Sequence, residues 1–112
     1  MDTNELALLM KALSSETRLR ILMLLRRHPL CAGRIARGTG ASASTASQHL
    51  RVLRSAGLVA DCRRGIHVHY SLVPERIREL EDAVGRLIPE GEPCDACLRP
   101  SEESGEINPD ED

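Results

Sequence analysis

Residues 41–57 read ASASTASQHLRVLRSAG, and the predicted fold of the whole chain depends on this segment. At about 100° per residue, as in a helix, the segment has two different faces. One face carries the apolar side chains of Ala43, Ala46, Leu50 and Leu53. The other carries Ser44, Thr45, Ser47, Gln48 and Arg51, with no carboxylate. Hydroxyl, amide and guanidinium groups hydrogen-bond phosphates and base edges, so this helix is a candidate for DNA contact. A plain solvated surface is the alternative.

The residues around this helix complete a helix-turn-helix. Ser42 is a good N-cap, and Gly57 follows the last periodic position as a stop. A shorter helix is predicted over residues 31–37, and Gly38, Thr39 and Gly40 close it. A short helix, a glycine-containing turn and a longer helix with a polar face are typical of this motif.

Two helices are predicted before the motif. Apolar residues at positions 6, 9, 10 and 13 give a first amphipathic helix over residues 3–13. Ser15 caps a second helix, ETRLRILMLLRR, with Glu16 near its positive end. Because residues 19–25 are apolar nearly all round, we expect this helix to be the buried central one. His28 and Pro29 end it, since the residue before proline disfavours helix.

A β-hairpin is predicted after the motif. Residues 58–63 and 67–73 are strand-like runs around Arg64, Gly65 and Ile66, and apolar and polar residues alternate in the second run. A hairpin after a helix-turn-helix is the wing of a winged helix. Arg63 and Arg64 at its tip are placed to reach a flanking phosphate or the minor groove. Cys62 is expected to face the apolar side of the wing, whereas His67 and His69 share the other face.

A last helix begins at Pro74, a favoured residue at the first helical position. Ile77, Leu80, Val84 and Leu87 recur at steps of three and four, and Ile88 extends the stripe. This spacing forms a seam for another helix, which covers either the domain's own core or a second copy; we expect a dimer face. Residues 1–88 thus form one winged-helix and dimerisation domain. Residues 89–112 are an acidic tail, expected to be mostly disordered, that carries a C-x-x-C pair.

Composition narrows the function classes. The chain has 112 residues, no Phe or Trp and one Tyr, so its core must be aliphatic. Residues 1–73 carry 11 basic and four acidic residues, whereas residues 74–112 carry four basic and 13 acidic residues. A basic body suits a polyanion.

No apolar run approaches the roughly 18 residues of a membrane span and no signal peptide is evident, so we expect a cytoplasmic protein. A phosphate loop, a Ser/His/Asp arrangement and a βαβ setting for a thiol oxidoreductase are all missing, which argues against an enzyme.

Three stretches resemble the ArsR/SmtB family of winged-helix repressors: LSSETRLRIL (13–22), SASTASQHLRVLRSAGLV (42–59) and RRGIHVHYSL (63–72). With their spacing they cover about residues 5–88. The resemblance implies a mainly α winged helix-turn-helix with five helices and a small β-hairpin. It implies a homodimer joined through the first and last helices, which represses from a pseudo-palindromic operator until an inducer, commonly a toxic metal ion, binds.

Residue by residue, the resemblance assigns DNA contact to the recognition helix and the wing. The recognition-helix positions are Ser42, Ser44, Thr45, Ser47, Gln48 and His49, and the wing positions are Arg63, Arg64 and Gly65. The chain departs from the family at Thr39 and Ala41, where larger apolar residues are usual, so the turn is expected to pack more loosely. Cys62 stands where many relatives have Arg.

The inducer site is predicted from the cysteines. The family's zinc-type site on the last helix needs histidine, and this helix offers only carboxylates. Its arsenic-type site pairs two cysteines at the start of the third helix, where this chain has Cys31 but Gly33. Cys94 and Cys97 form a C-x-x-C pair in the tail. We therefore expect Cys31, Cys94 and Cys97 to form a three-thiolate site, within or across the dimer, for arsenic(III) or another soft metal ion.

Two other functions stay open. The same thiols could instead respond to oxidants or persulfides, or no thiol inducer exists. A winged helix that mediates only protein contacts is the second alternative, against which the carboxylate-free helix face argues.

Overall fold

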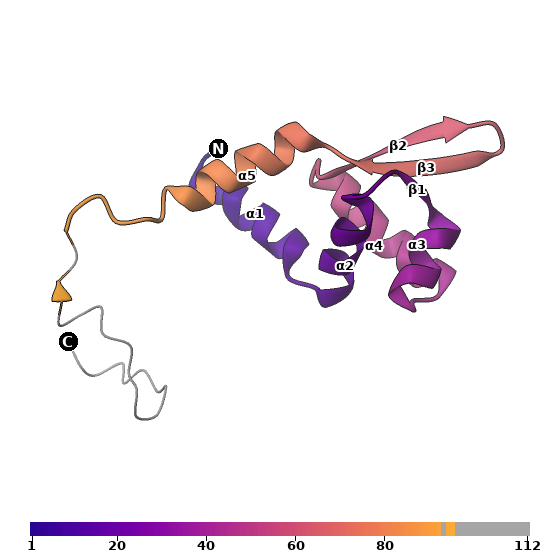
Figure 1. Ribbon diagram of the computed structural model, residues 1–112, viewed down its shortest axis with the longest axis horizontal. Helices are drawn as coiled ribbons and strands as arrows, with labels where there is room; N and C mark the ends of the chain where they lie inside the picture. The colour runs from indigo at the N-terminus through magenta and orange to yellow at the C-terminus, as the bar shows by residue number, and fades with distance from the viewer. Residues whose placement is uncertain (93, 96–112) are drawn as a thin grey trace, which may run out of the picture.

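The computed structural model describes residues 1–92 and 94–95, and within them the chain forms five helices and three strands (Figure 1). In chain order they are α1 (Thr3–Leu13), α2 (Glu16–Leu25), β1 (Leu30–Cys31), α3 (Ala32–Thr39), α4 (Ala43–Ser55), β2 (Val59–Arg64), β3 (His67–Leu72) and α5 (Pro74–Gly85). The predicted helices and hairpin are confirmed, and β1 was not predicted. Most of the predicted acidic tail, including Cys97, lies outside the described residues.

Short polar side chains begin the first two helices. The Asp2 carboxylate accepts a hydrogen bond from the Glu5 N–H at 2.7 Å, and the Ser15 hydroxyl accepts one from the Arg18 N–H at 3.3 Å. Each bond satisfies one of the donors that a helix leaves unpaired at its start. The sequence therefore sets these helix starts through local contacts.

The core is aliphatic, as predicted, and it gathers one face of each of the first four helices. The largest fully buried side chains are Leu9, Ile21, Ile35, Leu50, Leu53, Leu58 and Val59. Helix α2, expected to be the buried central helix, buries Ile21, Leu22 and Leu25, but it is not buried on all sides. Leu19 and Met23 are 46% and 59% exposed, because no other element among the described residues covers the outer side of α2.

The turn between α3 and α4 is held by hydrogen bonds. The Thr39 hydroxyl donates to the Ile35 carbonyl at 2.9 Å and accepts from the Ala41 N–H at 3.4 Å. Gly40 has a φ of 74°, a conformation that favours glycine. Thr39 thus closes the turn through polar contacts rather than apolar packing.

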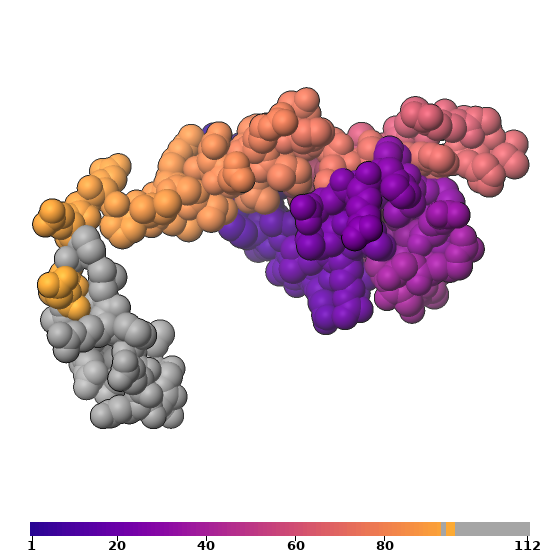
Figure 2. Space-filling view, in the orientation of Figure 1, coloured from indigo at the N-terminus to yellow at the C-terminus, as the bar shows by residue number. Residues whose placement is uncertain are grey.

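The three strands form an antiparallel sheet in the order β1-β3-β2. The hairpin of β2 and β3 projects beyond the helices as a wing (Figures 1 and 2). Gly65 turns its tip with a φ of 63°, and Ile66 beside it is 90% exposed.

The register of the sheet corrects the prediction for Cys62. Asp61 lies opposite Tyr70, which packs on the core, whereas Cys62 lies opposite His69. Successive side chains of a strand point to opposite faces, so Cys62 lies on the face away from the core, and it is exposed. Only Val59 of β2 is buried, since the rest of the strand extends past the helices.

Helix α5 lies along α1 at the end of the molecule away from the wing tip (Figure 1). The apolar residues predicted to form one helix-packing seam fall into two groups. Ile77 and Leu80 pack against the core, whereas Leu87 and Ile88 are 72% and 71% exposed just after the helix ends at Gly85. None of the described helices is long and apolar enough to cross a membrane.

The burial of the core predicts different losses of stability when two leucines are replaced by alanine. Leu53→Ala should lower the free energy of unfolding by about 2–5 kcal/mol, because a fully buried side chain leaves a cavity. Leu19→Ala, at a half-exposed position, should lower it by about 0.5 kcal/mol. Urea unfolding followed by circular dichroism measures both, and equal losses would contradict this description of the core.

Candidate nucleic-acid interface

Helix α4 presents its polar face to solvent because its apolar stripe is fixed in the core. Ala46, Leu50 and Leu53 are at most 2% exposed. The predicted contact residues Ser42, Ser44, Thr45, Ser47, Gln48 and Arg51 are all exposed. Ala43, predicted for the apolar face, is exposed as well, because it lies in the first turn, before the stripe meets the core. The structure therefore brings six of the predicted residues onto one surface.

The start of α4 is ordered by its own hydroxyls. The Ser42 hydroxyl accepts a hydrogen bond from the Thr45 N–H at 3.2 Å and donates to the Thr45 hydroxyl at 2.9 Å. The Ser44 hydroxyl lies 3.3 Å from the Ser42 Oγ atom. Such a helix start carries partial positive charge and favours anions. The first turn is thus a rigid, electropositive surface.

His49 lies differently from the other predicted contacts. It is half-buried, and Nη1 of Arg18 lies 3.2 Å from its Nδ1. The same guanidinium donates from Nε to the Ala12 carbonyl at 2.6 Å. Because arginine only donates, the imidazole accepts at Nδ1. Arg18 therefore ties α4 to the end of α1, a role that its sequence position did not reveal.

The wing adds basic side chains beside α4. Arg63 and Arg64 are exposed at the end of β2, and neither forms an ion pair within the part of the chain that the structure describes. Arg54 is different, since its Nη1 lies 3.1 Å from the Asp61 carboxylate on β2. Further exposed arginines, which the sequence interpretation did not single out, lie at Arg26, Arg27, Arg34 and Arg37. The exposed charge near α3, α4 and the wing is therefore largely positive.

The cysteines lie on separate elements. Cys31 is half-buried at the start of α3, on a groove of about 560 Å³ that Arg37 and His67 also line. Cys94 is exposed beyond α5, and α5 leads away from β1 (Figure 1). Among residues 1–92 and 94–95, no three His, Cys, Asp or Glu side chains are grouped to hold a metal ion. Cys97 lies outside the described residues, so the set of Cys31, Cys94 and Cys97 stays a prediction.

Comparison with known proteins gives the family. Residues 15–61 match the sequence model described as "Bacterial regulatory protein, arsR family". The chain is also 39% identical over 80 residues to the HTH-type transcriptional regulator YgaV of Escherichia coli, which covers 70% of this chain and 81% of YgaV. The chain belongs to the ArsR family.

The fold agrees with this assignment. The NMR structure of a homodimeric winged helix-turn-helix DNA-binding domain from Mycobacterium bovis, a possible ArsR-family regulator, matches with a TM-score of 0.64 and 34% identity. The match covers 75% of this chain and 78% of that one. The predicted family and winged helix-turn-helix fold are confirmed, and relatives in the ArsR family are named as transcriptional regulators rather than enzymes.

Two further ArsR relatives are named for toxic ions. The cadmium resistance regulatory protein CadC homolog of Staphylococcus aureus is 36% identical over 77 residues, covering 68% of this chain and 64% of its own length. The arsenical resistance operon repressor of E. coli is 40% identical over 67 residues, covering 59% and 57%. The chain thus spans about three fifths of the length of these two relatives.

The contribution of the Ser42 cap to stability can be measured separately from the effect of charge at the start of α4. Ser42→Ala should lower the free energy of unfolding by about 1 kcal/mol, because the Thr45 N–H loses its partner. Ser42→Asp should keep the stability, since a carboxylate caps equally well, but should weaken DNA binding by placing negative charge on the exposed polar face of α4. Thermal unfolding and fluorescence anisotropy measure the two effects. Equal DNA affinity of Ser42→Asp and the wild type would exclude the first turn of α4 from the interface.

Proposed function

We propose that the protein is a homodimeric transcriptional repressor that binds operator DNA in the cytoplasm. The observation that carries this proposal is the exposed, carboxylate-free face of α4, which is held rigidly by its buried stripe and its N-cap. Membership of the ArsR family and the exposed arginines of the wing support it. A module that only binds proteins would not need this combination of hydroxyl, amide and guanidinium groups.

The second copy is inferred from apolar surface on the terminal helices. Leu8 of α1 is 57% exposed, and Leu87 and Ile88 after α5 are exposed further still. The homodimeric relative from M. bovis supports the same assembly. A two-fold dimer would place two recognition helices in major grooves about one helical turn apart.

Different side chains would have different parts in recognition. Gln48 and Arg51 lie on the exposed face and can make bidentate hydrogen bonds to base edges. Ser42, Ser44, Thr45 and Ser47 suit phosphate contacts at the start of the helix. Arg63 and Arg64 would reach phosphates or the minor groove beyond the half-site.

These proposed contacts predict a different change in DNA binding for each side chain. Gln48→Ala should reduce discrimination between bases by about 1–3 kcal/mol, because it removes a base contact. Arg63→Gln should weaken binding to all sequences and lower the slope of log K against log salt by about 0.9, because one phosphate contact is lost. Arg78→Gln, an exposed arginine on α5, is the control and should change neither quantity.

Fluorescence anisotropy over a salt series, with DNA from upstream of the protein's own gene, measures these changes. Loss of binding in the wild type at low salt would exclude the repressor and leave the protein-contact module. A salt slope in Arg63→Gln equal to that of the wild type would remove the wing from the interface.

We further propose that an inducer bound at Cys31, Cys94 and Cys97 releases the DNA. Thiolates favour soft ions, and three sulfurs suit arsenic(III); the names of two relatives, for cadmium and for arsenicals, support an ion of this kind. Cys31 begins α3, which packs on α4, so a ligand there would act directly on the recognition helix. Because α5 leads away from β1, the tail of the second protomer is the better source of the other two thiols.

Arsenite should therefore release DNA from the reduced wild type but not from Cys31→Ser. Cys62→Ser is the matched control, since Cys62 lies exposed on the wing and outside the proposed set. Titration of the protein–DNA complex followed by anisotropy measures release. Equal arsenite sensitivity of Cys31→Ser and the wild type would remove Cys31 from the site. Release by oxidants or persulfides but not by arsenite would favour the thiol switch.

A further inference from the structure

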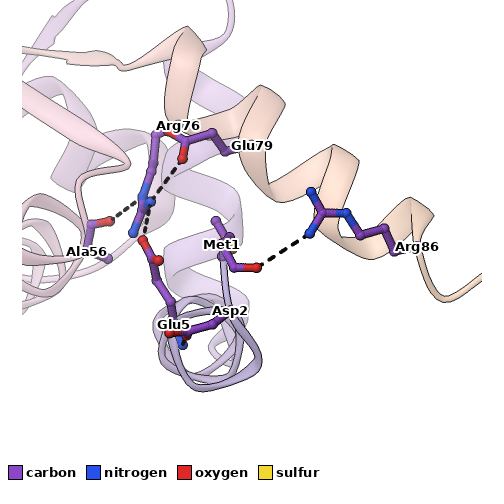
Figure 3. Close-up of polar contacts among 7 residues, drawn as sticks. All are labelled: Met1, Asp2, Glu5, Ala56, Arg76, Glu79 and Arg86. Carbon is purple, nitrogen blue, oxygen red and sulfur yellow. Dashed lines mark hydrogen bonds and ion pairs between the residues drawn. The ribbon is translucent and has the colours of Figure 1, made fainter.

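Arg76 joins three helices at one point. It lies in the first turns of α5, and its Nε donates a hydrogen bond to the Ala56 carbonyl at 3.2 Å. Its Nη1 donates to the Glu5 carboxylate of α1 at 2.8 Å and lies 3.5 Å from the Glu79 carboxylate on its own helix (Figure 3). One guanidinium thus holds together α1, α5 and the carboxyl end of α4.

The Ala56 carbonyl is the significant acceptor, because Ala56 is the C-cap of the recognition helix. The last carbonyls of a helix have no partner within it and carry partial negative charge, which a cation stabilises. Gly57 follows with a φ of 78°, and a Cβ there would lie 3.5 Å from Arg76 Nε. The chain leaves α4 in a conformation that favours glycine, directly beside the guanidinium.

Apolar packing does not fill this junction. A groove of about 370 Å³ opens between α1, α4 and α5, and Glu5 and Arg76 line it together with Leu8, Ala12 and Val52. The side chain of Arg76 is 21% exposed, less than either carboxylate that it binds. The polar contacts of Arg76 therefore bridge a gap that the hydrophobic core leaves open.

We propose that Arg76 is a positioning residue for DNA binding: through Glu5 and the Ala56 carbonyl, it fixes the angle of the recognition helix relative to α1 and α5. This inference rests on the proposed function, in which α1 and α5 form the dimer and α4 reads DNA. A half-site is read by one α4, whereas a full operator needs both α4 helices at a fixed separation. The contacts of Arg76 should therefore affect the affinity for a full operator more than the affinity for a single half-site.

The chemistry calls for arginine specifically. Guanidinium donors on Nε and Nη1 point in different directions and serve the Ala56 carbonyl and the Glu5 carboxylate at once. A lysine ammonium is a single nitrogen on a flexible chain and would hold one of these partners while leaving the other. Arg76→Lys therefore tests positioning without removing the charge.

The test compares a duplex containing two half-sites with a duplex containing one. In Arg76→Lys, Arg76→Gln and Glu5→Gln, we expect affinity for the first duplex to fall about tenfold, a usual size for coupling between sites. Affinity for the second should stay within about a factor of two. Arg78→Gln, the same charge change two residues further along α5, should alter neither affinity. Sedimentation should show all variants as dimers.

The outcomes separate positioning from other roles. Equal losses on both duplexes would show that Arg76 only supports the fold, and a monomeric variant would show that it supports dimerisation; either result overturns the proposal. Unchanged affinity of Arg76→Lys for the two-half-site duplex would also overturn it. Failure of the proposed function itself looks different, because the wild type would then bind neither duplex.

Discussion

The burial of one apolar stripe on α4 determines which side chains of that helix face solvent. Ala46, Leu50 and Leu53 sit in a core that has no Phe or Trp, so many aliphatic side chains must interlock to fill it. Such a core tolerates little change in shape. The stripe therefore fixes the rotation of α4 about its axis, and every hydroxyl, amide and guanidinium on the opposite side must face solvent. The exposed polar face of α4, which is the proposed recognition surface, is therefore a consequence of the packing behind it.

Polar contacts attach α4 to α1 and α5 in addition to the packing of the core. Arg18 ties α4 to the end of α1, and Arg76 ties its carboxyl end to α5 and to the start of α1. Both guanidiniums use several donors in different directions, which suits arginine. Helix α4, the proposed recognition helix, is thus attached at two places to the helices proposed to form the dimer. The proposed thiol site would act on the same helix through α3.

Local patterns were sufficient to predict the five helices and the hairpin, but not the two-residue strand β1. The serine caps, the period of the apolar residues and the glycine at the hairpin tip each act within a few residues, so the helices and the wing could be placed from sequence. The faces of Leu19 and Cys62 could not be placed correctly, because they depend on which layers cover α2 and on the register of β2 against β3. The Arg18–His49 and Arg76–Glu5 contacts join residues 31 and 71 positions apart, and no local signal marks such pairs.

The central claim is that two copies of this rigid face read DNA together. Selection of duplexes from a random-sequence pool by the full chain, followed by sequencing, tests it most directly. We expect a motif with two-fold symmetry whose half-sites are centred about 10–10.5 base pairs apart. Enrichment of a single unpaired half-site, or of no sequence at all, would contradict it.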